Sequence, residues 1–409
     1  MAATPAGTIR KPTWGFAALL ASLAMMAPFA VDMYLPAFPA IGAEFGVGEL
    51  ALQQTLSAYL FAFAFMLLWH GALTDAWGRR PVVIVGLAIY ALATLGCAIA
   101  GNIETLWLFR TLQGVSAGTG MVVGRAIVRD LYHGAEAQRL MSRVTLVFGI
   151  APAIAPIIGG ALLNVLGWRA IFWALLIWVG VVLAYCITRL QETLPPSHRQ
   201  PLHPRVMWRN YKGVISRPEF LLLAMLTTLN FGAFFIYIAA APAFLVNLLG
   251  VSTWGFAWLF IPMITGIMLG ASLSGRLAGR RSPQFTIRLG YGFMAAGVVL
   301  NVFVSFVLPP NVIWNVPPIF VFCTGSALVM PSVTLMLLDL FPTMRGLAAS
   351  LQGFVQFAVA GFLAGTVAPL LARSLIALSL GMATLTMASF VLWLIYQRRA
   401  RVLLKGWTP

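Results

Sequence analysis

One carboxylate in the sequence, Asp32, lies in a segment that is otherwise apolar and uncharged, between Pro28 and Pro39. A charged side chain inside a bilayer costs about 2.5–3.5 kcal/mol on insertion scales, so such residues usually face a bundle interior or a wet cavity and belong to a transport pathway. A carboxylate in that setting can carry a proton. The alternative is a structural acid that is tied to a helix end or to a neighbouring arginine. Asp32 is therefore the first candidate for proton coupling.

A second charge, Arg110, lies within another apolar segment and is followed by Gly114. If this segment is a helix that begins near Glu104, Arg110 lies about 9 Å below the membrane surface, at 1.5 Å per residue. Asp32 lies at a similar depth in a segment of opposite direction, so we expect the two side chains to approach directly or through water. Arg125, farther along the same segment, either snorkels to the membrane surface or lines the cavity.

A short connection between two apolar segments combines glycine with charged residues: Gly71, Asp75, Gly78, Arg79 and Arg80. Glycines permit a tight turn and a close helix approach, the Asp75 carboxylate can face the positive N-terminus of another helix, and Arg79 can pair with an acid such as Asp130. A solvated basic turn would explain the arginines but not the ordered glycine and aspartate positions. The loop is therefore a second candidate functional site.

The composition requires a membrane to surround these residues. The chain has 409 residues, of which 61% are hydrophobic and 9% charged, and its mean hydropathy is +0.92. Such a chain is not a soluble protein with one buried core. Its net charge of +16 would suggest nucleic acid as the partner of a soluble protein, but here the basic residues cluster between apolar runs, as membrane topology requires. We expect a lipid bilayer, and no nucleic acid, as the surroundings.

Apolar runs long enough to cross about 30 Å of hydrocarbon recur along the chain, and helices satisfy their own backbone groups there. The sequence predicts an all-α protein with twelve transmembrane helices in two bundles of six. The expected spans lie near 14–38, 52–72, 82–100, 105–127, 140–164, 169–190, 218–245, 254–276, 285–306, 313–336, 346–371 and 375–397.

The longest break between spans is rich in proline and basic residues and divides the spans six and six. We predict an N-terminal bundle over 1–190, a cytoplasmic linker over 191–217, and a C-terminal bundle with a cytoplasmic tail over 218–409. Alternate connections hold nearly all the Lys and Arg residues, so the positive-inside rule places both termini and the linker in the cytoplasm.

The two halves also resemble each other at one point. The loop from Gly71 to Arg80 after the second span is similar to the stretch from Ser272 to Arg281 after the eighth. Repeated halves with a substrate site between them, near the bilayer midplane, are a common transporter plan. Chance similarity of two short loops is the alternative. The second loop has Arg276 where the first has Asp75, so we expect a role for this carboxylate in the first half alone.

These motifs resemble known signatures of the major facilitator superfamily. The Gly71 to Arg80 loop is similar to the signature loop between its second and third helices, which implies a latch that closes the cytoplasmic side. The stretch from Arg110 to Gly118 resembles the signature of its proton-coupled members. The fifth span resembles the signature of its antiporters, as distinct from symporters, through small residues and prolines at three- and four-residue steps: Gly149, Pro152, Pro156, Gly159 and Gly160.

Three further stretches narrow this resemblance: Asp32 to Pro39, Val128 to Tyr132 and Leu351 to Phe357. With them the chain resembles Bcr/CflA-type drug:proton antiporters, the group associated with bicyclomycin- and chloramphenicol-type resistance. The resemblance covers essentially all twelve spans. It implies multidrug efflux by alternating access across a bacterial inner membrane.

The expected substrate cavity is aromatic and weakly polar. An apolar site with few polar anchors suits bulky amphiphilic molecules better than sugars. Packing inside a bundle or contact with lipid is the alternative role for most of these side chains. Besides Asp32 and Arg110, the candidates for substrate binding are Tyr34, Tyr59, Phe63, Asn230, Phe234, Tyr237, Trp258, Gln352 and Gln356.

We therefore expect an exporter in which Asp32 releases a proton to the cytoplasm, the cavity binds a drug, and reprotonation outside accompanies drug release. Proton-coupled transport of a small endogenous metabolite is the alternative within transport. A channel is disfavoured because a single buried acid does not form a pore ring. An enzyme is disfavoured because the four histidines are scattered and no metal or nucleophile spacing emerges. We expect no catalytic residue, metal or cofactor, and a monomer.

Overall fold

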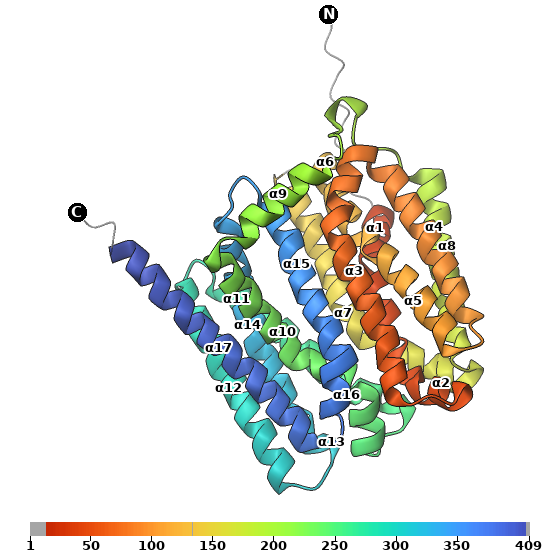
Figure 1. Cartoon of the computed structure of the whole chain (residues 1–409), viewed down its shortest axis with the longest axis vertical. Helices are drawn as coiled ribbons and strands as arrows, with labels where there is room; N and C mark the ends of the chain where they lie inside the picture. The colour runs from red at the N-terminus through yellow and green to blue at the C-terminus, as the bar shows by residue number, and fades with distance from the viewer. Residues whose placement is uncertain (1–13, 133, 406–409) are drawn as a thin grey trace, which may run out of the picture.

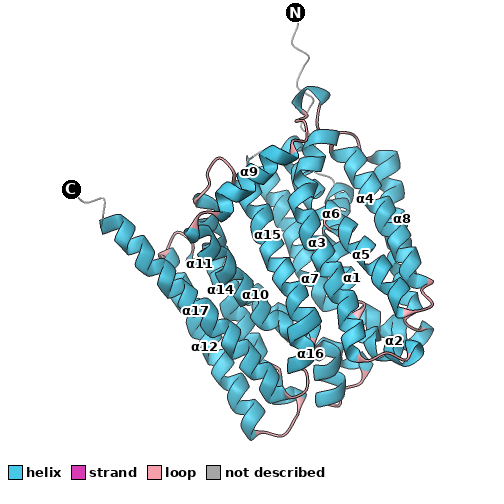
Figure 2. Ribbon diagram, viewed as in Figure 1, coloured by secondary structure: helices cyan, strands magenta, loops and turns pink. Residues whose placement is uncertain are grey.

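The computed structural model describes residues 14–132 and 134–405, and within these ranges every regular element is a helix (Figures 1 and 2). Eleven segments in the described part are long and apolar enough to cross a membrane. The predicted all-α class, with two bundles of transmembrane helices, is confirmed.

The first half of the chain supplies the helices that carry Asp32, Arg110 and the glycine-rich loop. They are α1 Trp14–Asp32, η1 Leu35–Ala37, α2 Phe38–Phe45, α3 Glu49–Trp77, α4 Arg79–Ala98, α5 Ile103–Ala117, α6 Thr119–Leu131, α7 Gly134–Leu166 and α8 Arg169–Arg189.

The linker holds η2 Pro196–His198 and the amphipathic helix α9 Pro204–Ile215. The second half follows with α10 Pro218–Ala239, η3 Ala243–Leu248, η4 Thr253–Phe256, α11 Ala257–Leu277, α12 Pro283–Val307, α13 Val312–Asn315, α14 Pro317–Asp339, α15 Arg345–Phe362, η5 Leu363–Val367, α16 Ala368–Leu371 and α17 Leu375–Lys405.

Two of the expected spans are interrupted, one at a glycine and one near a proline. The span expected at 105–127 is divided at Gly118 into α5 and α6, so it does not count among the eleven long segments. The span expected at 14–38 ends as an α-helix at Asp32 and continues through η1, because Pro36 lacks the N–H that a continuing helix needs. The end of α1 falls at Asp32 itself, and the break at Gly118 comes eight residues after Arg110.

The two halves meet along two pairs of helices. α3 packs against α15 and η5, and α7 packs against α11 and η4 (Figure 1). The linker helix α9 crosses one end of the molecule near α3 and α15, which we call the linker end. There the Tyr211 hydroxyl donates a hydrogen bond to the Leu68 carbonyl, 2.7 Å away. The linker thus contacts a helix of the first half directly.

Glycines bring the helices of the first half into close contact. A Cβ atom at Gly114 would overlap the backbone of Tyr59, and one at Gly120 would overlap the backbone of Leu23. Small residues allow such backbone approaches within a bilayer, where packing replaces the hydrophobic effect as the driving force. The close packing of α5 and α6 against neighbouring helices thus depends on these two glycines. The three cysteines are buried and unpaired.

Candidate functional site

Arg110 lies at the centre of a polar cluster in the first half and is fully buried. Its Nη1 atom donates hydrogen bonds to Gln113 Oε1 at 2.5 Å and to the carbonyl oxygen of Ala30 at 3.0 Å. Its guanidinium carbon lies 4.6 Å from the ring centroid of Tyr34 and 4.5 Å from that of Tyr59. Stacking between two aromatic rings stabilises a cation through the negative faces of the rings. Among the described residues, the Nε and Nη2 atoms have no hydrogen-bond partner.

Hydrogen bonds fix the side chains around Arg110. The Tyr34 hydroxyl lies 2.7 Å from Thr55 Oγ1, and the Tyr59 hydroxyl donates to the Ala27 carbonyl at 3.3 Å. Gln113 Nε2 donates to Thr94 Oγ1 at 2.9 Å, which turns its amide oxygen toward Arg110. These bonds orient the side chains around Arg110, while the Nε and Nη2 atoms of the arginine stay unpaired among the described residues.

Asp32 is the last residue of α1 and is 5% exposed. Across residues 14–132 and 134–405, its carboxyl group has no hydrogen bond and no ion pair. The direct contact expected between Asp32 and Arg110 is thus not formed in this conformation, and contact through water stays a prediction. A carboxyl group without a partner can exchange a proton without first breaking an ion pair.

The end of α1 explains why Arg110 binds the backbone rather than Asp32. The Tyr34 amide donates to the carbonyl of Val31 instead of that of Ala30. The Ala30 carbonyl is therefore one of the acceptors that a helix end leaves unpaired. The guanidinium of Arg110 satisfies this carbonyl two residues before Asp32.

The antiporter-like stretch of α7 packs against the same point. A Cβ atom at Gly159 would overlap the backbone of Met33, directly after Asp32, and Pro156 and Gly160 are buried. The other end of the stretch differs, because a Cβ atom at Gly149 would meet nothing within 4 Å and Pro152 is half-buried. Close packing is therefore confined to the part of the stretch that supports the end of α1.

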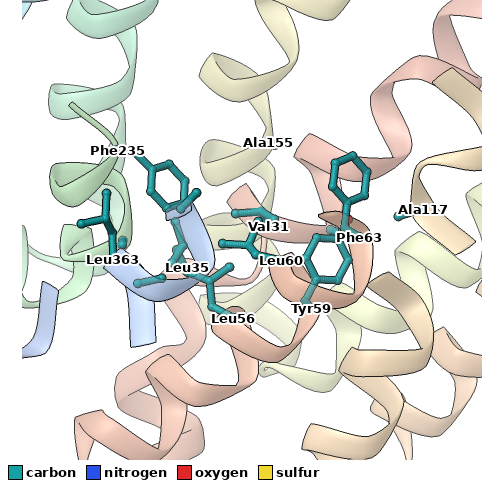
Figure 3. Close-up of a cluster of buried hydrophobic side chains, with 14 of the residues drawn as sticks. Val31, Leu35, Leu56, Tyr59, Leu60, Phe63, Ala117, Ala155, Phe235 and Leu363 are labelled. Carbon is teal, nitrogen blue, oxygen red and sulfur yellow. The ribbon is translucent and has the colours of Figure 1, made fainter. Parts of the chain in front are cut away.

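Aromatic rings connect the two halves beside this cluster. Tyr59 stacks with Phe63 on α3 at 6.3 Å between centroids, and Phe63 lies 4.8 Å from Phe357 on α15. Phe357 also lies 5.9 Å from Phe231 on α10. In Figure 3, Tyr59 and Phe63 come from one half, and Phe235 from α10 lies across the buried cluster from them. Sequence reasoning missed Phe231 and Phe357, although Phe357 follows Gln356 within a singled-out stretch.

The candidates from the second half are divided between this region and other parts of the bundle. Phe234 lies 5.1 Å from Phe231 and so joins the aromatic rings. Gln352 is buried and donates to Thr227 Oγ1 at 3.2 Å. The Gln356 side chain is half-buried.

Three other candidates lie elsewhere. Tyr237 accepts a hydrogen bond from Asn301 at 2.7 Å, inside the second bundle. Asn230 is fully buried, and its amide has no hydrogen bond of good geometry. Trp258 is 61% exposed on α11. The structure brings none of these three into contact with the Arg110 cluster.

The glycine-rich loop forms a charged cluster at the linker end. Arg79 is 7% exposed, and its guanidinium binds Asp75 at 2.5 Å and Asp130 at 3.0 Å. The expected pair of Arg79 and Asp130 is present. Gly78 adopts φ +100°, a conformation that favours glycine, whereas Gly71 lies in open space. The close helix approach expected at Gly71 is not formed in this conformation, because among the described residues nothing from another helix lies within 4 Å of a Cβ atom placed there.

Glu192, an acid of the linker, completes this cluster. Its carboxylate accepts the backbone N–H groups of Arg79 and Arg80 at 2.9 and 3.2 Å, at the N-terminus of α4. A carboxylate is favourable there because of the helix dipole. Thr193 donates to Asp130 at 2.8 Å. A lone acid at the start of a basic linker is the signal that sequence reasoning passed over.

The Asp75 carboxylate faces Arg79 in this conformation, and no described contact joins it to a helix N-terminus of the second half. The similar loop of the second half has a glycine with φ +73° at Gly279. Among the described residues, no ion pair involves Arg276, Arg280 or Arg281. The charged cluster is thus one-sided, as the sequence predicts.

Known proteins resemble this chain in sequence and in fold. The profile of the Major Facilitator Superfamily matches residues 20–365. The chain is 28% identical over 363 residues to a protein named bicyclomycin resistance protein homolog from Haemophilus influenzae, and the match covers 88% of this chain and 90% of that protein. It is 28% identical over 310 residues to a chloramphenicol resistance protein of Pseudomonas aeruginosa, with 76% and 73% covered.

A third relative is the multidrug resistance protein MdtL of Escherichia coli, 29% identical over 340 residues, with 82% of this chain and 83% of that protein covered. Among solved structures, the chain is similar to a bacterial homologue of the human lysosomal transporter Spinster in an inward-facing and unoccupied conformation. The TM-score is 0.71 at 14% sequence identity, with 99% of this chain and 100% of that chain covered. This structural likeness concerns the fold.

Proposed function

The chain belongs to the Major Facilitator Superfamily, and from this premise we propose that it is a proton-coupled antiporter that exports amphiphilic drugs. The observation that carries the proposal is a buried carboxyl group without a partner, Asp32, next to the helix end that binds Arg110. Three relatives that are named for drug resistance support the choice of drugs as substrates.

The proposed cycle follows from the position of Asp32. In the inward-facing state Asp32 releases its proton to the cytoplasm and a drug enters between the two halves. After the halves reorient, Asp32 is protonated from outside and the drug leaves. One charge that crosses 100 mV is worth about 2.3 kcal/mol, which corresponds to nearly two decades of concentration ratio. This energy is sufficient for uphill export with one proton per drug.

The aromatic rings between the halves favour apolar, ring-containing substrates. Phe63, Phe357 and Phe231 offer ring faces from three helices, α3, α15 and α10, while Arg110 offers two nitrogen atoms, Nε and Nη2, whose N–H groups are unpaired among the described residues. An apolar wall with few polar groups suits amphiphilic drugs better than hydroxyl-rich sugars. We include Asp32, Arg110, Tyr34, Tyr59, Phe63, Phe234, Gln352 and Gln356 in the proposed substrate and proton region.

The charged cluster around Arg79 serves in this proposal as the cytoplasmic latch. Basic residues gather at the linker end, which the positive-inside rule assigns to the cytoplasm of a bacterial inner membrane. The ion pairs of Arg79 would hold the α3–α4 turn in one shape while the two bundles rotate. Asp75, half-exposed here, is then available to a helix N-terminus of the second half when that side closes.

Two measurements test this function. Cells that lack their main efflux pumps, with and without the protein, are compared on a drug panel that includes chloramphenicol and bicyclomycin. Purified protein in liposomes then reports the direction of flux under an imposed pH gradient. The proposal expects raised resistance and drug export against proton entry. Unchanged resistance together with proton-driven flux of a small metabolite would instead identify a metabolite transporter.

A further inference from the structure

Near its start, α3 reaches across to the second bundle at the end opposite the linker. Three of its side chains donate hydrogen bonds to backbone carbonyl groups of α10, α15 and η5, and we call this set the carbonyl clamp. It joins Gln53 to Ala239, Gln54 to Gly365 and Ser57 to Gly361, each at 2.7 Å. Side chains from one bundle that bind the other must separate when this end opens.

The acceptors of the clamp are available because the helices that hold them are irregular. Ala239 is the last residue of α10, where carbonyl groups lack a helical N–H partner. Gly361 and Gly365 border or belong to η5, a short π-helical turn, and such turns change the hydrogen-bond pattern and frequently mark functional sites. A Cβ atom at Gly365 would overlap Ser57. The second bundle thus has a backbone shaped to accept these donors.

The opposite face of the same turn of α3 holds Thr55 and Tyr59. At 100° per residue, Thr55 lies about 160° around the helix from both Gln53 and Ser57. The Thr55 hydroxyl donates to the Leu52 carbonyl at 2.6 Å, so its oxygen accepts from the Tyr34 hydroxyl, 2.7 Å away. One helical turn therefore binds the second bundle on one face and the Arg110 cluster on the other.

We propose that residues 53–59 of α3 couple the Asp32–Arg110 cluster to an outer gate, with the carbonyl clamp as the gate and Thr55 as the joint. When Asp32 loses its proton, its carboxylate competes with the Ala30 carbonyl for the guanidinium of Arg110. When Asp32 is protonated, this competition ends. Arg110 stacks on Tyr34, so its displacement moves the Tyr34 hydroxyl and, through Thr55, the turn that holds the clamp. This inference rests on the proposed proton coupling and adds the residues that transmit it.

The groups around Asp32 leave few competing titrations. The titratable and charged groups of this cluster are Arg110 from α5, Tyr59 from α3, Tyr90 and Cys97 from α4, and Tyr34 after α1. Two further groups lie on α3: Glu49, which interacts with Gln53 of the clamp, and His70, which contacts Thr119. The stretch of α7 that packs against the end of α1, residues 149–166, contains no charged residue. The pH response of the label is therefore measured in a Glu49→Gln, His70→Gln parent. In that parent a response between pH 5 and 8 reports Asp32, because arginine, tyrosine and cysteine ordinarily titrate above that range.

The clamp is tested by labelling a cysteine that the closed gate covers. Ala240→Cys, at a fully buried position beside Ala239, is introduced after the three native cysteines are replaced by alanine. A membrane-impermeant maleimide is then applied from outside to protein in liposomes. Gln54→Ala and Ser57→Ala should each raise the labelling rate about fivefold, the equivalent of one lost hydrogen bond of ~1 kcal/mol.

Trp107→Phe is the matched control, because it removes a hydrogen bond to the Ala51 carbonyl at the same end but within the first bundle. Its labelling rate should equal that of the parent. Gln54→Asn, which keeps an amide that is too short to reach Gly365, covers the case in which an alanine variant does not fold. Clamp variants that fold and label at the parent rate would refute the gate.

The joint is tested by the pH response of the same label. Thr55→Val removes the acceptor for Tyr34 but keeps the shape of the side chain, and it should abolish the change of labelling rate between pH 5 and 8. Thr55→Ser should keep that change. A double-mutant cycle with Ser57→Ala then measures the coupling between joint and clamp.

The outcome with Asp32→Asn separates this inference from the proposed function. If Asp32→Asn abolishes the pH response and Thr55→Val does not, proton coupling at Asp32 stands and the joint is refuted. If Asp32→Asn keeps the response, the proposed function itself fails. If both abolish it while Thr55→Ser retains it, the joint is supported.

Discussion

The guanidinium of Arg110 donates a hydrogen bond of 3.0 Å to the carbonyl oxygen of Ala30, and this bond joins α5 to the last turn of α1. The arginine is fully buried between the rings of Tyr34 and Tyr59. Its position therefore depends on the planar shape of the guanidinium as well as on its charge. Asp32 ends the same helix turn, so any change at one residue reaches the other through two residues of backbone.

Arg110→Lys keeps the charge but should lower transport at least tenfold, because a compact ammonium group does not stack between two aromatic rings as the planar guanidinium does. Initial export rates in liposomes, normalised to inserted protein, measure the effect. Arg169→Lys is the matched control, since Arg169 also stacks on an aromatic ring, Trp168, but is partly exposed. Equal rates for the two variants would show that charge alone matters at Arg110.

Gly159→Ala should destabilise the protein by about 1–3 kcal/mol, because the new methyl group would overlap the backbone of Met33 and force two helices apart. Gly149→Ala, in the same helix, adds the same methyl group where nothing lies within 4 Å. Thermal unfolding of the purified proteins in detergent compares them. A Gly159→Ala protein as stable as Gly149→Ala would show that α7 and the end of α1 are not tightly packed.

Asp130→Asn should impair transport more than Asp75→Asn, although both should insert normally. Asp130 is the less exposed carboxylate and also accepts from Thr193; charge-assisted hydrogen bonds of this kind contribute about 1.5–3 kcal/mol each. The labelling rate of a cysteine introduced at the linker end, measured from the cytoplasmic side, should rise in both variants. Asp339→Asn serves as the control, because its pair with Arg345 is exposed and such pairs contribute about 0–1 kcal/mol. Wild-type export and accessibility in the Asp75 and Asp130 variants would contradict the latch.

Sequence patterns were sufficient for the membrane spans and insufficient for the contacts at their ends. Apolar length and charge between spans predicted the helices, yet the break at Gly118 came as a structural finding, because glycine is also common inside transmembrane helices. The bond from Arg110 to Ala30 depends on the Tyr34 amide turning to Val31, a local choice that no spacing rule predicts. Glu192 reaches the α4 N-terminus across 113 residues of sequence, which residue patterns do not encode.

Both termini and the linker should lie in the cytoplasm. At Arg205, in α9, a reporter domain that works only in the cytoplasm should be active. At Gly101, between α4 and α5, a reporter domain that works only in the periplasm should be active. The expectation follows from the basic residues at the linker end. Periplasmic activity at Arg205 would reverse the assigned direction of export.

Proton release on drug addition tests the central role of Asp32 most directly. Purified protein in weakly buffered detergent solution receives a drug that the susceptibility panel has identified, and a pH dye records the protons released. The wild type should release protons in proportion to bound drug. Asp32→Asn, which nearly keeps the shape but exchanges no proton, should bind a neutral drug, release none, and lose uphill export under an imposed pH gradient. Proton release and uphill export at wild-type levels by Asp32→Asn would contradict the assignment of proton coupling to Asp32.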